Sequence, residues 1–275
     1  MRTDNSQFIS VVMGVLYRKD DLAPLRRSVE SILNQSYRDF EFLICDDGST
    51  WEAMNLLEDY QRKDARIRLI RPGNKMDLAS KLNVCLKEAK GNYIARMDDD
   101  DCSDSVRFEK QLQILDSEPD IAFAGCNVRL WQDGRICGIR RFPEYPQIRD
   151  FYITQPYIHP TLLFRREALE TVNGYSEDRH QLLCEDYDLL LRLSAKGYRG
   201  KNLQEELFDY TIPKDGKGKR KMHHRWNEVV TRWARFRDLD RLPEALPYVL
   251  KPVVTGLLPE NLLSKLKKKR NGGIG

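Results

Sequence analysis

The sequence lacks the features that mark membrane-spanning and exported proteins. It has no uninterrupted apolar run of about eighteen residues, the length that a helix needs to cross a bilayer. Residues 1–7 are polar, and the apolar run that follows them is too short for a signal peptide. These absences predict a cytoplasmic protein without a transmembrane helix.

Two further absences concern cysteine and glycine. The six cysteines form no Cys-x-x-Cys pair, so we expect reduced thiols that fill the core, not a disulfide framework or a zinc site. Neither a Walker loop nor a Gly-x-Gly-x-x-Gly fingerprint occurs. A glycine-rich phosphate cradle is therefore not expected, and a bound diphosphate would need a metal ion to neutralise it.

The small net charge is unevenly distributed along the chain. It amounts to +4 over 275 residues, with acidic residues gathered at 98–104 and basic residues after Lys214. A chain of this length can bury one large α/β core and carry an appendage. We therefore expect a domain at 1–212 and a basic, mostly helical appendage at 213–275.

Apolar runs that alternate with helical periodicity predict an α/β fold with a mostly parallel central sheet and helices on both faces. Ligands of such sheets bind at the carboxyl ends of the strands. The expected strands are at 8–16, 40–45, 66–70, 93–97, 121–130, 135–140 and 161–165. The expected helices are at 22–33, from 49 onward, at 77–89, at 105–115 and after Cys184.

Local signals mark where two of these helices begin. Ser49 and Glu52 have the spacing of a capping box, which predicts that Ser49 caps the second helix. Asp20 or Asp21 is expected to cap the first helix.

Two acidic clusters fall at the ends of predicted strands. Asp46 and Asp47 follow the strand at 40–45, and four consecutive aspartates at 98–101 follow the strand at 93–97. Alternate residues of a strand point the same way, so Asp98 and Asp100 together could bind Mg²⁺, which takes one or two carboxylates plus substrate phosphates. A solvated acidic turn explains the same residues as well.

An EF-hand calcium loop does not fit the aspartate run. Cys102 stands where an oxygen ligand is needed, and Ser103 stands where the sharp turn needs glycine.

A third acidic pair, Glu185 and Asp186, opens a predicted helix. It either offsets the helix dipole or supplies a general base. His159 either lines an acceptor site or packs as a structural histidine.

Taken in order, these segments make the chain resemble the family 2 glycosyltransferases with the GT-A fold, especially bacterial members that build surface polysaccharides. The resemblance covers roughly residues 8 to 210. It rests on the opening strand through Tyr17 and on the segments 28–37, 46–50, 91–101, 159–161 and 185–193. The order and spacing of these segments carry more weight than any one of them.

The resemblance implies roles for individual residues in inverting transfer from a nucleotide diphosphate sugar. Tyr17 and Asp47 would hold the donor's base, and Asp98 would lie near the ribose or the metal's waters. Asp100 would bind Mg²⁺ or Mn²⁺, with Asp98 as a second ligand, directly or through water. Asp186 would be the catalytic base, with Glu185 as the fallback.

Two departures from the family pattern limit these assignments. The residue inside Asp-x-Asp is often small in this group, whereas here it is Asp99, which leaves the ligand choice open by one residue. The Gln-x-x-Arg-Trp motif of processive members is absent, which favours a single sugar addition.

The acceptor and the basic C-terminal region leave alternatives open. The acceptor would be a saccharide or a lipid-linked saccharide. The region after Lys214 is either a packed appendage with a solvated tail or a surface that lies on an anionic membrane at the inner face of the cell. Nucleic-acid binding is not expected, because no recognition module accompanies the charge. The alternative functions are a nucleotidyltransferase and a non-catalytic nucleotide-sugar-binding regulatory protein.

Overall fold

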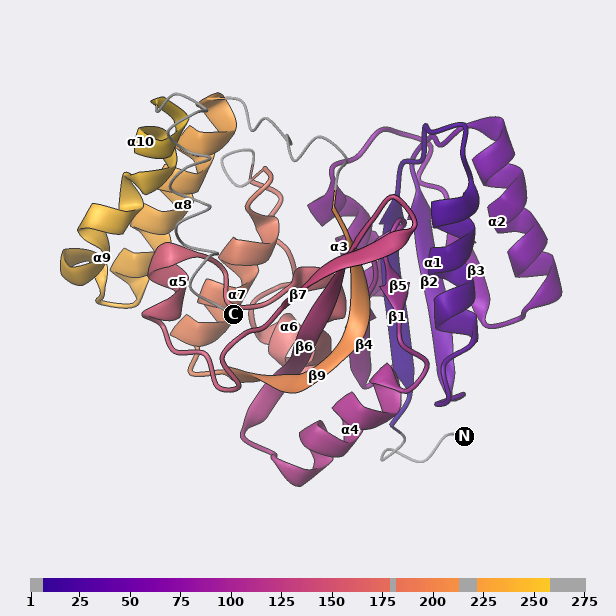
Figure 1. Ribbon diagram of the computed structural model, residues 1–275, viewed down its shortest axis with the longest axis horizontal. Coiled ribbons are helices and arrows are strands. Elements are labelled where there is room, and N and C mark those ends of the chain that lie inside the picture. The colour runs from indigo at the N-terminus through magenta and orange to yellow at the C-terminus, as the bar shows by residue number, and fades with distance from the viewer. Residues whose placement is uncertain (1–6, 179–181, 213–221, 258–275) are drawn as a thin grey trace.

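The apolar runs of the sequence form the first four strands of a central sheet. These are β1 (Ile9–Val15), β2 (Phe40–Asp46), β3 (Ile67–Ile70) and β4 (Tyr93–Arg96). The computed structural model describes residues 7–178, 182–212 and 222–257 (Figure 1). Almost every residue of β1, β2 and β4 is buried, as expected for strands that are covered on both faces.

The later strands extend this sheet in the order β3-β2-β1-β4-β8-β6-β9-β5, with β7 paired to β6. Their pairings give β6 and β9 the direction of β1 to β4, whereas β5, β7 and β8 run the opposite way. The predicted mostly parallel sheet is thus confirmed. The later strands are β5 (Cys102–Ser103), β6 (Ile121–Gln132), β7 (Arg135–Arg140), β8 (Leu163–Arg165) and β9 (Arg199–Thr211).

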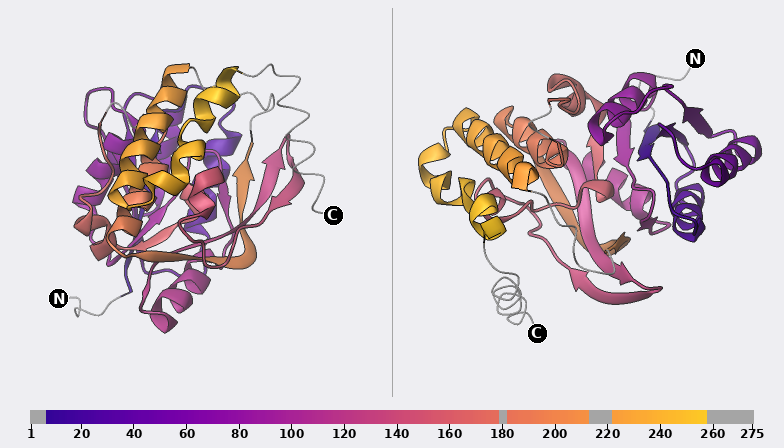
Figure 2. Two further views of the ribbon diagram at one scale, coloured as in Figure 1. Left: turned by 90° about the vertical axis from the view of Figure 1, so that its left-hand side faces the viewer. Right: turned by 90° about the horizontal axis from the view of Figure 1, so that it is seen from above.

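Helices cover both faces of the sheet (Figures 1 and 2). Because side chains alternate along a strand, Val11 and Met13 of β1 pack in the cluster that includes α1, α2 and α4, whereas Val12 packs in the cluster that includes α3, α6 and α7. The helices before residue 200 are α1 (Ala23–Leu33), α2 (Trp51–Lys63), α3 (Leu78–Glu88), α4 (Arg107–Ser117), α5 (Asp150–Ile153), α6 (Arg166–Thr171) and α7 (Glu185–Ala195).

Three helices follow the sheet at one end of the molecule (Figure 2). They are α8 (Met222–Asp238), α9 (Leu242–Val249) and α10 (Lys251–Leu257). Phe236 of α8 and Val249 of α9 belong to the same apolar cluster as Leu190 of α7, so these helices pack against the rest of the chain. The basic runs at 214–221 and 265–270 lie outside the described residues. The domain boundary at 212 stays a prediction.

Two predicted caps are wrong. Thr50 is the N-cap of α2, with its hydroxyl accepting a hydrogen bond from the Ala53 N–H, whereas Ser49 instead contacts Asp46 and Tyr17. Leu22 is the N-cap of α1, although the Asp21 carboxylate accepts a hydrogen bond from the Ala23 N–H at 2.9 Å. Ser49 thus holds the turn before α2. Asp21 bonds to the first N–H of α1, but it stands one residue before the N-cap.

Within the described part of the chain, no helix combines the length and apolar character that crossing a bilayer requires. All six cysteines are free thiols, and four of them are buried in the core.

Candidate active site

The carboxyl ends of neighbouring parallel strands bring the first two acidic clusters to one edge of the sheet. Asp46 ends β2 and lies in register with Val15 of β1, and Asp98 follows the end of β4 by two residues. Residues 97–101 themselves lie outside any strand. The alternation of a strand therefore does not extend to Asp98 and Asp100, because β4 ends at Arg96.

The turn after β2 is held by its own carboxylate. Oδ1 of Asp46 accepts hydrogen bonds from the Gly48 N–H, the Ser49 N–H and the Ser49 hydroxyl, the last at 2.7 Å. Gly48 has a φ of +124°, a conformation that side chains rarely adopt. Ser49 also accepts a hydrogen bond from the Tyr17 N–H at 2.8 Å, which ties this turn to the segment after β1.

Asp47 forms a buried ion pair with Lys81 of α3. Its Oδ1 lies 2.9 Å from the Lys81 ammonium, and its Oδ2 accepts a hydrogen bond from the Met76 N–H at 2.8 Å. Burial opposes ionisation of this carboxyl, but the bonds from Met76 and Lys81 outweigh it and lower the pKa of Asp47. The carboxylate is thus fixed in its charged form.

The aspartate run is held by the neighbouring Arg96 and by groups from the distant segment that holds Lys19 and Ser28. Arg96 pairs with the Asp98 carboxylate, and the Ser28 hydroxyl donates to the Asp98 carbonyl at 2.6 Å. Lys19 lies 3.3 Å from the Asp100 carboxylate. The side chains of Asp98 and Asp100 are both about one-third exposed, at 33% and 34%, so each carboxylate reaches solvent.

The other two aspartates of the run are more buried. Burial, followed by the charges of Asp100 and Asp98, raises the pKa of Asp99 to about 7. Asp101 is 1% exposed, and although its Oδ1 accepts the Thr211 N–H, its Oδ2 has no hydrogen-bond partner. Burial raises the pKa of this carboxyl well above its usual range. Both carboxyls therefore resist ionisation among their neighbouring aspartates.

This donor set fits a hard divalent cation. Carboxylate oxygens are the ligands that Mg²⁺ and Mn²⁺ prefer. Among the described residues, no group of three or more His, Cys, Asp or Glu side chains could hold a metal ion. The protein would thus supply only one or two ligands, which is how Mg²⁺ binds when substrate phosphates complete its shell.

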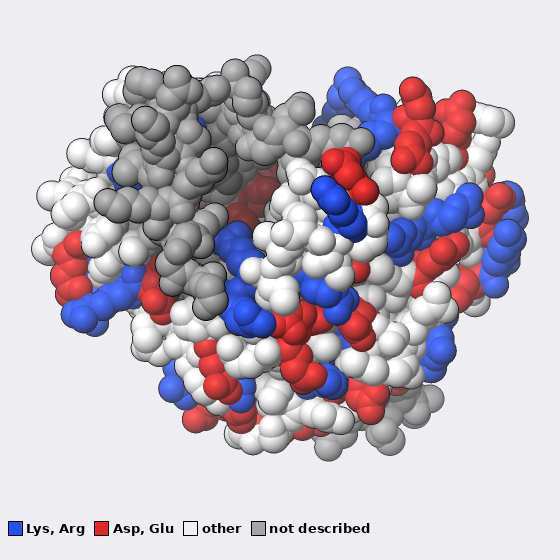
Figure 3. Space-filling model, viewed as in Figure 1, with Lys and Arg blue, Asp and Glu red and all other residues white. Residues whose placement is uncertain are grey.

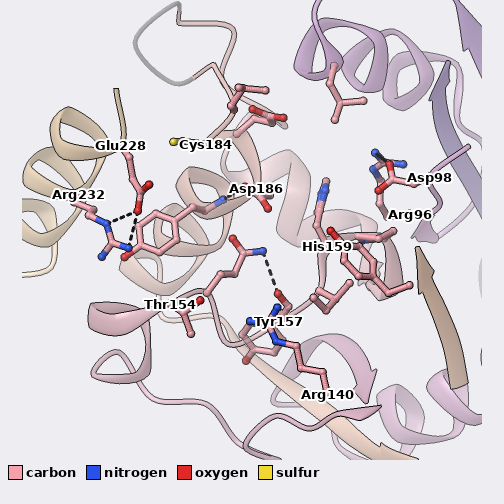
Figure 4. Close-up of a pocket in the computed structure, with 18 of the residues that line it drawn as sticks. Arg96, Asp98, Arg140, Thr154, Tyr157, His159, Cys184, Asp186, Glu228 and Arg232 are labelled. Atoms are coloured by element: carbon pink, nitrogen blue, oxygen red, sulfur yellow. Dashed lines mark hydrogen bonds and ion pairs between the residues drawn. The ribbon is translucent and has the colours of Figure 1, made fainter. Parts of the chain in front are cut away.

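A pocket of about 420 Å³ joins the aspartate run to the third acidic pair (Figure 4). Asp98 lines it from the end of β4, and Glu185 and Asp186 line it from the first turn of α7. Figure 4 shows Asp98 and Asp186 on facing sides, with His159 between them in this view. Acidic residues almost ninety positions apart in the sequence thus face one cavity.

The two carboxyls of α7 differ in their surroundings. Burial, and then the charge of Asp186, raises the pKa of Glu185 to about 7. Oδ1 of Asp186 accepts a hydrogen bond from the Tyr187 N–H at 2.7 Å. Leu183, just before the helix, has a φ of +64°, and Cys184 is the N-cap residue, although its side chain makes no capping hydrogen bond to the helix.

Besides His159, for which the sequence left two alternatives, the pocket is lined by groups to which sequence reasoning gave no role. Arg96 is fully buried, and its Nε has no hydrogen-bond partner. His159 lies 2.8 Å from the Tyr175 hydroxyl, and burial together with the charge of Arg96 lowers its pKa well below the usual range, so the ring is neutral. Glu228 and Arg232 reach the pocket from α8. No motif in the sequence links α8 to the acidic clusters.

Three predicted residues do not line the pocket. Tyr17 is 2% exposed, and its hydroxyl donates to the Asp21 carbonyl at 2.7 Å. Asp47 lies in its pair with Lys81, and Asp100 faces Lys19. The structure therefore brings Asp98, Glu185 and Asp186 together and places Tyr17, Asp47 and Asp100 on the adjoining edge of the sheet.

Comparison with known sequences gives one family. The profile of Glycosyl transferase family 2 matches residues 10–172, more than half of the chain. The chain is 32% identical over 263 residues to the putative glycosyltransferase EpsE of Bacillus subtilis (strain 168), covering 95% of this chain and 94% of EpsE. It is 29% identical over 202 residues to the Escherichia coli UDP-Glc:alpha-D-GlcNAc-diphosphoundecaprenol beta-1,3-glucosyltransferase WfaP, covering 71% and 74%.

Solved structures share the fold at lower identity. The structure of S. aureus TarS 1-349 with UDP-GlcNAc has a TM-score of 0.68 at 17% identity, covering 88% of this chain and 72% of that one. The mannosyltransferase PcManGT of Pyrobaculum calidifontis, solved with GDP-Man and Mn²⁺, has a TM-score of 0.62 at 15% identity, covering 97% and 80%. These likenesses confirm the predicted GT-A type of fold.

Proposed function

This chain belongs to glycosyltransferase family 2, and we propose that it transfers one sugar, with inversion and metal dependence, from a nucleotide diphosphate sugar to an acceptor hydroxyl. Sugar transfer follows from the family. The inversion, the metal and the residue roles are the proposal. A nucleotidyltransferase and a non-catalytic binding protein are set aside, because the family match identifies a glycosyltransferase.

The observation that carries the proposal is the pocket that Asp98 and Asp186 share. Displacement at an anomeric carbon with inversion needs the leaving diphosphate on one side of the sugar and the attacking hydroxyl on the other. A donor bound at the aspartate run would have its diphosphate on one side of the sugar. A base on α7 would activate the attacking hydroxyl on the other side. The volume of about 420 Å³ suits a sugar with its reaction partner.

On the donor side, we assign the base of the nucleotide to Tyr17 and Asp47 and its ribose to Asp98. The Lys81 pair keeps Asp47 charged and oriented, as a hydrogen-bond acceptor for a base must be. Asp100, with Asp98 directly or through water, would hold Mg²⁺ or Mn²⁺. The chemistry supplied there is stabilisation of charge on the departing diphosphate. Mn²⁺ accompanies GDP-Man in the structure of PcManGT.

On the acceptor side, we assign the general base to Asp186, with Glu185 as the fallback. The Asp186 carboxylate would take the proton of the acceptor hydroxyl as its oxygen attacks. Such assistance contributes about two to four orders of magnitude in rate. The neutral His159 next to this site can hydrogen-bond a sugar hydroxyl without adding charge.

The acceptor is proposed to be a saccharide or a lipid-linked saccharide of bacterial surface polysaccharide synthesis. WfaP acts, by its name, on a diphosphoundecaprenol-linked sugar. We place the reaction on the cytoplasmic side, with a catalytic domain at 1–212 and the appendage at 213–275.

The test is a panel of UDP-, GDP- and TDP-sugars with Mg²⁺, Mn²⁺ or a chelator, scored by thermal stabilisation and donor hydrolysis. We expect one nucleotide to stabilise the wild type by about 2.7 kcal/mol at a hundred times its Kd, and only when metal is present. Asp100→Ala should remove this effect. Asp120→Ala, an exposed carboxylate before β6 at the opposite edge of the sheet, should keep it. Binding that is equal with chelator, or equal in both variants, would refute the metal assignment.

A further inference from the structure

The helix α8 presents apolar side chains to solvent and charged ones to the interior. Glu228 and Arg232 are mostly buried, and they pair with each other at 2.9 Å. Arg232 also donates to the Phe151 and Tyr152 carbonyls. The outward side chains are between 36% and 56% exposed and recur at helical spacing: Met222, Trp226, Val230 and Trp233. A surface helix usually turns apolar side chains to the core, so this outward apolar series is unusual.

A second apolar series lies on the neighbouring helices. Its members follow the same spacing of four, four and three, and they are between 46% and 72% exposed: Leu246, Leu250, Val254 and Leu257. Arg225 of α8 donates to the Pro252 carbonyl of α10 at 3.1 Å, so the helices that carry the two series are in contact. We call these eight side chains the outer apolar face.

Water is a poor partner for such a surface. Each square ångström of apolar area that leaves water contributes about 25 cal/mol, so two half-exposed tryptophans gain substantially from being covered. Apolar side chains that gather on one face mark an interaction site, whereas single ones do not. The described helices leave this face uncovered even though α8 buries Val229 and Phe236 nearby.

Charge on α8, and in the sequence on either side of the three helices, indicates what covers the outer apolar face. Arg237 continues the exposed face of α8 one turn beyond Trp233. In the sequence, five of the eight residues at 214–221, directly before α8, are Lys or Arg, as are five of the six at 265–270 after α10. Tryptophan prefers the boundary between lipid and water, and basic clusters prefer anionic headgroups. We propose that the outer apolar face docks on the surface of an anionic lipid bilayer.

The position of α8 connects this docking to the active site. Its inner residues Glu228 and Arg232 line the pocket (Figure 4), while its outer residues belong to the apolar face. One helix therefore separates the proposed bilayer from the acceptor side of the pocket. If the acceptor is lipid-linked, which rests on the proposed function, docking places its sugar within reach while the lipid stays in the membrane.

The experiment measures co-sedimentation of the full chain with vesicles of phosphatidylcholine containing about one-third phosphatidylglycerol, and with phosphatidylcholine alone. The variant Trp226→Ser/Trp233→Ser tests the face. Trp51→Ser is the matched control, because Trp51 is 69% exposed on α2 at the far end of the molecule (Figure 1). We expect the wild type and Trp51→Ser to bind the anionic vesicles, and the double variant to bind at least about tenfold more weakly.

Metal-dependent donor hydrolysis, measured in parallel, reports folding and the proposed function separately from docking. The double variant should keep wild-type hydrolysis. Equal vesicle binding by wild type and double variant would overturn the proposal even if hydrolysis is present. A wild-type dimer that dissociates in the double variant, without vesicle binding, would assign the face to a second copy of the chain instead.

Discussion

At the scale of single residues, Glu185 and Asp186 compete for the same role. Both line the pocket from the first turn of α7. Because the pKa of Glu185 is raised to about 7, its carboxyl is protonated for a large part of the time near neutral pH and is then unable to accept a proton. This favours Asp186 as the base. The raised pKa of Glu185 can be measured separately, through the pH dependence of stability.

We predict that Asp186→Asn lowers kcat by about two to four orders of magnitude, because the amide cannot take the proton of the acceptor hydroxyl. Donor binding should stay within a fewfold of wild type, since Asp186 lies across the pocket from Asp98 (Figure 4). Steady-state kinetics and calorimetry with the donor measure these two quantities. Unchanged turnover in Asp186→Asn, together with a loss in Glu185→Gln, would move the role to Glu185.

The raised pKa of Glu185 also predicts how stability depends on pH. Between its usual value of 4.5 and about 7, the folded state binds this proton more tightly than the unfolded state. The contribution of Glu185 to stability is therefore present below about pH 4.5 and is lost as the pH rises through 7, by up to about 3 kcal/mol. Urea unfolding across this range should show that Glu185→Gln becomes more stable relative to the wild type as the pH rises. Parallel curves for the two proteins would contradict the shift.

The identity of the site residues was partly readable from the sequence, but their environments were not. Asp47 and Asp101 look alike as members of aspartate runs. Asp47 is held in its charged form by Lys81, whereas burial raises the pKa of Asp101 well above its usual range. These differences depend on partners such as Lys81 and Thr211, which lie 34 and 110 positions away along the chain.

At the scale of elements, the strongly apolar strands were predictable and the half-exposed ones were not. The run that forms β1 is buried on both faces and has a clear signal, whereas β9 (Arg199–Thr211) alternates buried residues with Gln204 and Glu205 and was missed. The two-residue strand β5 is formed by its pairing with β9, which no local pattern encodes. The short helices α5 and α6 were also missed, because four and six residues give too little periodicity.

The wrong cap of α2 leads to a prediction at this scale. Thr50→Ala should cost about 1 kcal/mol, the usual value of a lost N-cap. Ser49→Ala should cost more, because it removes bonds to Asp46 and to the Tyr17 N–H while Oδ2 of Asp46 already lacks a partner. Urea unfolding of the two variants gives the order. A larger loss of stability for Thr50→Ala than for Ser49→Ala would contradict this order.

At the scale of the whole molecule, the appendage is part of the pocket and of the core. Arg235 of α8 lies 3.4 Å from the fully buried Asp188 of α7, and Tyr152 packs edge-on against Phe236. The three-helix end therefore contributes buried contacts. In Figure 3 its visible left edge is mostly uncharged, with charged side chains below. The sequence indicated a basic tail, but the buried face of α8 depends on how it packs on α7.

This packing predicts the outcome of truncation. A chain ending at residue 212 loses Arg235 beside Asp188, Phe236 against Tyr152 and Arg232 at the Phe151 carbonyl, together with the buried apolar side chains of α8 and α9, so it should lose at least about 5 kcal/mol, comparable with the whole stability of a domain. A chain ending at Leu257 keeps α8, α9 and α10 and should unfold like the full chain. Urea unfolding followed by circular dichroism compares the three chains. Equal stability of the chain ending at 212 would mean that residues 1–212 fold independently and that the appendage serves only the pocket and the outer apolar face.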